Sequence, residues 1–306
     1  MGASVTIPLE QAFNRAKQIT FRPFDLSKWF VLGFAAWLAT LGEGGAGASY
    51  RKSFGGDGRG PGPLQPGGDW ITAHLVFAIA VAALAAIVLI LLGLLVAWIR
   101  SRATFVFLDN LAGNEAAIVA PWKQFGPLGD SLFLFWVGLG AIWLVCYAVV
   151  GGVGVVVAWP DICAAQFGLH AIAAILLGLT LLPLTLVLAI IAWCLNNFVA
   201  PLMYLRQQAA LPAWREFYTA LLPGNVGSFV LFLLLQLVLR LAIGIISVLL
   251  GCATCCIGFL PYLGTVITLP LQVFDRCYSV YFLEQFGPEY RIFRQIDEWA
   301  GESPVY

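Results

Sequence analysis

Charged residues are scarce in this sequence. Only 10% of its 306 residues are Asp, Glu, Lys or Arg, and 61% are hydrophobic, whereas ordinary soluble domains carry about 25% charged residues. A soluble domain of this length has too much surface for its volume to bury so many apolar side chains. The scarcity of charge therefore excludes an ordinary soluble fold and leaves the lipid bilayer as the expected surroundings of the chain.

An excess of either charge sign is also missing, because 16 basic residues balance 16 acidic ones. Without a basic patch, nucleic acid is not an expected partner. The usual catalytic signatures are absent as well: the sequence has no HExxH, GxSxG, GxxxxGK[ST] or helix-opening GxGxxG motif. We therefore predict no catalytic residues, no cofactor and no bound metal.

Long apolar runs are what the sequence does contain. Five exceed the ~18–20 residues needed to cross a bilayer: about 71–99, 131–158, 169–195, 226–251 and 257–283. A sixth run, 28–42, crosses only if its helix continues towards Ala48, and is otherwise re-entrant. Residues 1–27 are too charged for a secretory signal peptide. The predicted fold is an all-α, polytopic integral membrane bundle of six transmembrane helices.

Basic residues are unevenly divided among the segments that join the runs. Twelve Lys or Arg residues fall in the two terminal segments and in 99–130 and 196–225, but only three fall in the alternate loops. Because Lys and Arg stay in the cytoplasm, this predicts a multi-pass protein of the inner (plasma) membrane with both termini cytoplasmic.

A short motif recurs at the predicted cytoplasmic ends of three spans. It reads FLDN from Phe107, YLRQ from Tyr204 and FLEQ from Phe282. Three other spans begin with a serine before hydrophobic residues. These recurrences predict a pseudo-threefold repeat of helix pairs within one membrane domain, 1–306. Its parts are the repeats 71–158 and 169–251 and the half-repeats 8–48 and 257–306. The alternative is that aromatic and small polar residues gather at every membrane interface.

Between the paired spans lie short segments with an amphipathic pattern. In the first, Leu9, Ala12, Phe13, Ala16 and Ile19 share one helical face, opposite a polar face that includes Arg15. Such a face beside basic residues predicts helices lying flat on the cytoplasmic membrane surface. The loop 43–70 is rich in Gly and Pro and is expected to be a flexible outer loop.

The stretch 21–34 reads FRPFDLSKWFVLGF. Together with the repeat layout, it resembles an uncharacterised family of bacterial multi-pass membrane proteins. The layout is also distantly similar to the membrane domain of some glycerophosphodiester phosphodiesterases, whose catalytic domain has no counterpart here. The resemblance implies the architecture and carries no function.

Ionisable groups inside spans are costly and mark candidate sites. Arg240 lies twelve residues after Ser228, and Glu43 lies sixteen after the equivalent Ser27. A long Arg side chain bridges that one-turn difference, so we predict a Glu43–Arg240 pair in the outer half of the bundle. The alternative is that Arg240 reaches the interface and Glu43 is solvated.

Overlaying the repeats on their recurring motif gives a second candidate site. Arg100, Asn197 and Asp275 then take one equivalent position, seven residues before Phe107, Tyr204 and Phe282. A cation, an amide and a carboxylate at one depth are expected to meet near the pseudo-threefold axis. The favoured role is closure of the bundle. The alternatives are transport or proton relay, and a coincidence of polar residues at the membrane interface.

Four of the seven cysteines fall on the predicted outer side: Cys163, Cys252, Cys255 and Cys256. An oxidising space there permits a disulfide from Cys163 to the 252–256 turn. A zinc site that includes His170 is a further alternative, although the spacing is not diagnostic. The other cysteines are interpreted as packing residues.

Three function classes remain open. A non-enzymatic subunit or organiser of a membrane complex is favoured, with the bilayer and other membrane subunits or a homo-oligomer as partners. A small-molecule or ion transporter or channel is the alternative, since internal repeats and charges at depth occur in transporters. A lipid-handling membrane enzyme is the third.

Overall fold

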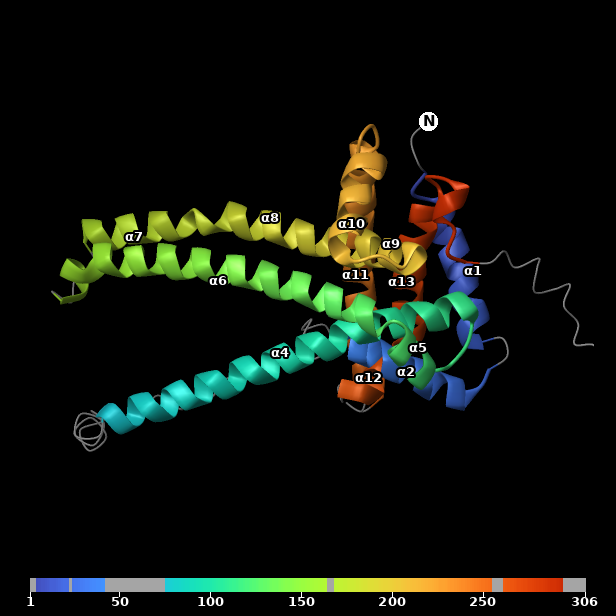
Figure 1. Cartoon of the computed structure of the whole chain (residues 1–306), viewed down its shortest axis with the longest axis horizontal. Coiled ribbons are helices and arrows are strands. Elements are labelled where there is room, and N and C mark those ends of the chain that lie inside the picture. Colours follow the sequence, from blue (N-terminus) through green and yellow to red (C-terminus); the bar gives the residue numbers. More distant parts are fainter. Residues whose placement is uncertain (1–3, 22–23, 42–74, 164–167, 255–260, 294–306) are drawn as a thin grey trace, which may run out of the picture.

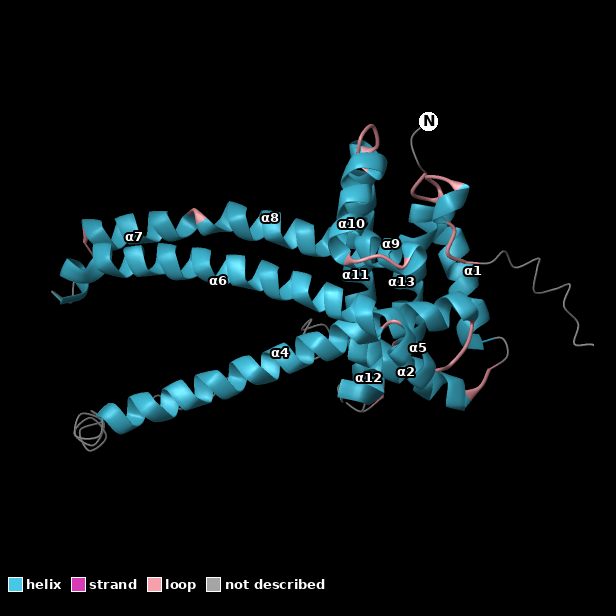
Figure 2. Cartoon of the chain, in the orientation of Figure 1, coloured by secondary structure: helices cyan, strands magenta, loops and turns pink. Residues whose placement is uncertain are grey.

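The computed structural model describes residues 4–21, 24–41, 75–163, 168–254 and 261–293. All regular elements in these ranges are helical (Figure 2), as predicted. In chain order they are α1 (Ile7–Phe21), α2 (Leu26–Thr40), α4 (Leu75–Gly113), α5 (Val119–Gln124), α6 (Gly126–Cys163), α7 (Leu169–Leu179), α8 (Leu181–Cys194), η1 (Leu195–Val199), α9 (Ala200–Arg206), α10 (Ala210–Glu216), η2 (Phe217–Leu221), α11 (Val226–Ala253), α12 (Pro261–Ile267), α13 (Leu269–Glu284) and η4 (Pro288–Tyr290).

The helices form two contrasting regions (Figure 1). We call the lengths of α4, α6 and α7–α8 that project to one side the arms, defined as residues 75–97, 138–163 and 169–192. We call the compact end the hub, made of α1, α2, α9, α10, α13 and the adjoining ends of the longer helices. No described side chain in the arms is buried. The fully buried large side chains all lie in the hub, so the core of the chain is there.

Aromatic side chains build the hub core. Phe232 of α11 stacks on Phe282 and Tyr278 of α13, with ring centroids 4.3 and 4.6 Å away. Phe198 of η1 packs edge-on against Phe229 at 5.0 Å. Each ring buries a large apolar area and adds about 0.5–1.5 kcal/mol of aromatic pairing beyond that area. These contacts fix α11, α13 and η1 around one point.

Four helices are long and apolar enough to cross a membrane, which indicates a membrane protein: Ile79–Gly113, Gly126–Asp161, Leu169–Arg206 and Val226–Ala253. The predicted run 28–42 forms α2, a shorter apolar helix. The predicted run 257–283 divides into α12 and α13 at Thr268, and much of α13 is buried against protein. Six spans are therefore not confirmed. Figure 1 also shows α11 running across the direction of the arms.

The two ends of the chain pack against each other. Helix α1 lies along α13, and α2 lies along α12. The split third repeat unit requires this packing, because its halves are 8–48 and 257–306. The repeat itself stays a prediction. At its recurring motif, the Tyr204 hydroxyl donates to Asp109 at 2.8 Å, so two of the three motifs are in contact.

The amphipathic face of α1 packs differently from the prediction. Ala12, Ala16 and Ile19 are buried in the hub core, whereas Phe13 is 62% exposed. Arg15, predicted on the solvated face, is only 2% exposed and donates to the carbonyls of Leu111 and Ala112 in the last turn of α4. A cation at a helix C-terminus satisfies carbonyls that have no partner within the helix. The buried part of the face therefore covers α13, and the position of α1 on a membrane surface stays a prediction.

Candidate functional site

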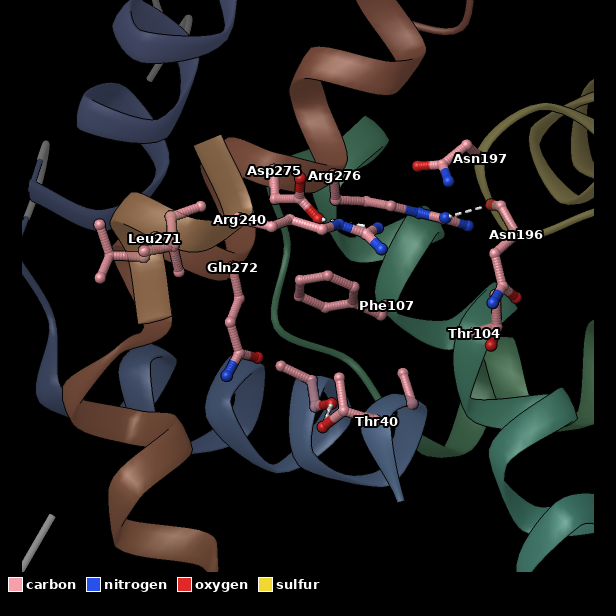
Figure 3. Close-up of a pocket in the computed structure, with 13 residues that line it drawn as sticks. Thr40, Thr104, Phe107, Asn196, Asn197, Arg240, Leu271, Gln272, Asp275 and Arg276 are labelled. Carbon is pink, nitrogen blue, oxygen red and sulfur yellow. Dashed lines mark hydrogen bonds and ion pairs between the residues drawn. The ribbon is translucent and has the colours of Figure 1, made fainter. Parts of the chain in front are cut away.

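A pocket with charged walls lies in the hub between α2, α4, η1, α11 and α13 (Figure 3). We call it the polar pocket; its cavity volume is about 180 Å³. Five helical elements from distant parts of the sequence meet there. Its lining consists of Ala36, Ala39, Thr40, Thr104, Phe107, Asn196, Asn197, Arg240, Ile243, Leu271, Gln272, Asp275 and Arg276.

Gln236 organises the polar groups beside this pocket. Its side chain is fully buried. The amide nitrogen donates to Asn197 Oδ1 at 2.8 Å and to Asp275 Oδ1 at 3.1 Å, and its oxygen accepts from the Trp193 indole N–H at 2.7 Å. Both amide protons and the oxygen of Gln236 are used, as a buried polar group requires. The network ties α8, η1, α11 and α13 together.

Arginine side chains from two helices enter the pocket. Arg240 of α11 pairs with Asp275, with Nη2 and Oδ2 3.3 Å apart. Arg276 of α13 donates from Nη1 to the backbone carbonyl of Asn196. Figure 3 shows both arginine side chains extending in the same direction across the pocket.

Helical spacing explains why these residues share one site. Gln236 and Arg240 are four residues apart on α11, and Gln272 and Arg276 are four apart on α13, so each pair lies on one helix face. η1 is a π-helical turn between α8 and α9. The backbone carbonyl of Asn196 in this turn accepts from Arg276. Single π-helical turns are frequent at functional sites.

The described lining of the pocket contains both cations and a carboxylate. Among its lining residues that the structure describes, Asp275 is the one carboxylate, and Arg240 and Arg276 are both cations. Two threonine hydroxyls and three side-chain amides supply further polar groups, and Ile243 and Leu271 form an apolar wall. The described lining therefore combines charged, polar and apolar groups.

The predicted repeat-equivalent cluster is brought together in part. Asn197 and Asp275 are linked through the shared Gln236 amide. Arg100 instead lies over the Trp136 ring, 5.2 Å from its centroid, and lines a different cavity between α4 and α6. Equal depth in a repeat does not fix the direction in which a side chain leaves its helix, so Arg100 faces α6.

The other predicted pair falls partly outside the described residues. Glu43 is outside them, so its pairing with Arg240 stays a prediction. The structure gives Arg240 another partner, Asp275. Sequence reasoning missed Gln236, although an amide within the apolar run and four residues before Arg240 is a visible signal.

The outer cysteines are free where the structure describes them. Cys163 and Cys252 are both free thiols. Cys255 and Cys256 lie outside the described residues, so a bridge from Cys163 to either stays a prediction. His170 lies against Asp161, with Nδ1 and Oδ1 3.0 Å apart. In the described ranges, no three His, Cys, Asp or Glu side chains are grouped as metal ligands, so the zinc alternative gains no support.

The family model of the Family of unknown function (DUF7544) matches residues 5–265, and the chain belongs to this family. No curated protein and no solved structure matches the chain. The predicted resemblance to an uncharacterised family is thereby confirmed.

Proposed function

We propose that this member of the family is a non-enzymatic subunit or organiser of a complex in the inner membrane. The proposal rests on the exposed apolar surface of the arms, which no other part of the described chain covers. The most apolar stretches of α4 and of α7–α8 have no buried residue. Lipid covers some of this surface, but α4 and α6 also diverge (Figure 1), which leaves room for other helices.

The glycines along the arms are a reason to expect that partner helices cover part of this surface. A Cβ built on Gly138, Gly140, Gly151, Gly152 or Gly178 has no atom of the described chain within 4 Å. Small residues at membrane-helix interfaces let two backbones approach closely and gain van der Waals contact. Glycines that serve no packing within the chain are therefore suited to packing against another chain.

The space between α4 and α6 adds a second feature. A cavity of about 580 Å³ opens between them, lined mostly by apolar residues and by Arg100 and Trp136. It is more than three times the volume of the polar pocket. A partner helix that inserts large side chains here would restore the dense packing typical of protein interiors.

The test is the size of the native complex after substitution of an arm glycine. Gly151→Leu is expected to reduce or abolish a higher-mass species seen by native electrophoresis of gently solubilised membranes. Gly227→Leu is the matched control, because a Cβ built on Gly227 also meets no atom within 4 Å, whereas this residue lies in the first turn of α11 at the hub. A complex that survives Gly151→Leu and equivalent changes at Gly140 and Gly178 would contradict the proposal.

A second candidate, transport of a small molecule or ion, is favoured by the polar pocket and its charges. A flux assay in proteoliposomes distinguishes it, since a subunit alone moves no substrate. The third candidate, an enzyme acting on lipid, is distinguished by a lipid-turnover assay.

The orientation with both termini cytoplasmic belongs to the proposal as well. It is supported by the uneven distribution of Lys and Arg. Labelling of a cysteine introduced at Lys123, between α4 and α6, by an impermeant reagent in intact cells tests it. Labelling from outside would reverse the orientation.

A further inference from the structure

We propose that a groove at the hub binds an anionic phospholipid, with one acyl chain in the groove and the phosphate at Lys17. We call it the hub groove; helices α1, α11 and α13 form it, and its cavity volume is about 450 Å³. The inference goes beyond the proposed function and does not depend on it, because the arms contribute no residue to the described lining. It rests on the lining of the groove, its size and its one cation.

Apolar side chains from three helices line the hub groove. On α1, the buried Ala16 and Thr20 form its floor. The Thr20 hydroxyl donates to the carbonyl of Ala16 at 2.6 Å, so its proton is already used within the helix. Leu239 and Ile246 of α11 and Phe274 of α13 supply larger apolar walls. Such a lining suits hydrocarbon, and it offers little to the polar groups of a ligand.

The hub groove is separate from the polar pocket, although the two are neighbours. Ile243 and Leu271 line both cavities and so form the wall between them. None of the charged residues that line the polar pocket belongs to the described lining of the hub groove. The ligand of the hub groove is therefore decided by the groove's own residues.

The size of the hub groove favours an acyl chain over a protein segment. One turn of an α-helix, about 10–12 Å across and about 5.4 Å long, occupies roughly 400–600 Å³. A cavity of about 450 Å³ takes no more than about one such turn, too little to seat a membrane-crossing helix. The same volume is about fifteen times the ~30 Å³ of a water molecule in the liquid, and a methylene group is of similar size. One acyl chain therefore fits.

Lys17 is the one charged side chain among the described residues that line the hub groove. It has no hydrogen bond or ion pair within the described chain. Positions 13, 14, 20 and 21, which lie one turn away on α1, carry no Asp or Glu. The described chain thus supplies a cation at the groove and no matching anion. The phosphate of a phospholipid has the complementary charge and accepts charge-assisted hydrogen bonds from an ammonium group.

Two phenylalanine rings flank Lys17 and indicate the level of a headgroup. Phe13, Lys17 and Phe21 follow one another at four-residue spacing, so they lie along one face of α1. The two rings are 62% and 50% exposed. Interfacial helices place Phe side chains at the boundary between headgroups and acyl chains, with Lys or Arg beside them. A Lys in this position keeps its stem among apolar groups and extends its ammonium group towards the phosphates.

Native mass spectrometry of the full chain in an uncharged detergent tests the site. Phosphatidylglycerol and phosphatidylcholine with the same acyl chains are added in equal amounts, and an excess of the anionic lipid among the adducts is expected. Lys17→Gln should reduce that excess about fivefold, the upper range for one exposed ion pair. Lys123→Gln is the matched control, because Lys123 is also exposed but lies on α5 outside the groove. It should leave the excess unchanged.

A second pair of variants tests the groove itself. Ala242 of α11 is exposed and lines the hub groove, so Ala242→Trp should fill the groove and remove the lipid adduct. Leu241→Trp is the matched control, because Leu241 is 67% exposed and is not part of the described lining. Both positions are exposed, so neither substitution should disturb the hub core, and unfolding in mixed detergent checks this.

Loss of the adduct in Ala242→Trp, together with loss of the anionic preference in Lys17→Gln, would support the proposal. Equal binding of the two lipids would overturn it, as would a preference that Lys17→Gln leaves intact or an adduct that survives Ala242→Trp. A polypeptide that Ala242→Trp removes in place of a lipid would also overturn it and would assign the groove to a protein partner. None of these outcomes bears on the arm glycines, so the proposed function is tested separately.

Discussion

The hub and the arms are both built from apolar helices, yet they use their side chains in opposite ways. In the hub, aromatic rings stack and Gln236 is completely hydrogen-bonded in the interior. In the arms no described side chain is buried. Hydropathy alone does not separate the two regions, because the run 257–283 is apolar and nevertheless forms the largely buried α13. The difference is one of partners: the described chain supplies them in the hub and leaves the arms uncovered, where our proposal places lipid and other chains.

The largest expected difference between the hub and the arms concerns the loss of one aromatic ring from the hub core. Phe232→Ala should lower the free energy of unfolding by about 3–5 kcal/mol, through lost burial and the cavity left behind. Leu92→Ala in the α4 arm, where the side chain is 52% exposed, should change it by about 0.5 kcal/mol or less. Unfolding in mixed detergent, followed by tryptophan fluorescence, measures both. Equal effects would contradict the division into two regions.

Arg15 tests whether α1 belongs to the hub. Arg15→Met keeps the length of the side chain but leaves the Leu111 and Ala112 carbonyls without their donor. The expected loss is about 2–3 kcal/mol of unfolding free energy. Arg102→Met is the control, because Arg102 pairs with the half-exposed Asp130, and such pairs contribute about 1 kcal/mol or less. If Arg15→Met were no more harmful than Arg102→Met, α1 would lie on the membrane surface as its sequence pattern predicted.

Gln236 tests whether the polar network stabilises the hub. Gln236→Leu removes the partner of Trp193, Asn197 and Asp275 together. About 2 kcal/mol should be lost, the cost of leaving buried groups unsatisfied. Gln207→Leu is the control, since Gln207 is exposed. Adding Asn197→Leu to Gln236→Leu should recover part of the loss, and additive losses in this double-mutant cycle would argue against the network.

The smallest expected effect concerns pH and Glu284, the last residue of α13. Burial raises the pKa of Glu284, and the backbone N–H groups of Phe293 and Ile292 oppose this in part. A raised pKa means that the folded chain holds the proton more tightly. The stability of the fold therefore falls as the pH rises from 4.5, the ordinary pKa of a glutamate, through the raised pKa of Glu284.

Glu284→Gln removes this charge and keeps an acceptor for the two N–H groups. Its thermal stability relative to the unchanged chain should therefore be higher at pH 7 than at pH 4, by about 1 kcal/mol or less. Melting curves at the two pH values measure the difference. A relative stability that is greater at pH 4 would show that hydrogen bonding to the carboxylate outweighs its burial.

The sequence was sufficient for the helical class, the family and the three arm runs, because long apolar runs have few alternatives in water or lipid. It also anticipated that Asn197 and Asp275 belong to one site. It was insufficient for Arg100, since the repeat gives depth but not the rotation of a helix about its axis. It was wrong for Arg15, because a face that packs on another helix has the same periodicity as a face that lies on a membrane.

Other features depend on tertiary contacts that no local pattern encodes. The break at Thr268 turns one apolar run into two short helices, and the partner of α13 is α1, more than 240 residues earlier. The pairing of Arg240 with Asp275 likewise depends on how α11 meets α13. Such choices are decided by packing of the whole hub, in which each helix restricts the positions open to the others.

The most direct test of the central claim, that other membrane chains cover the arms, is native mass spectrometry of the protein extracted gently from its own membrane. The account predicts a second polypeptide at fixed stoichiometry, and it predicts that the arm-glycine substitutions remove this polypeptide. A single chain that carries only lipid or a small ligand would contradict it and would favour transport or lipid handling instead.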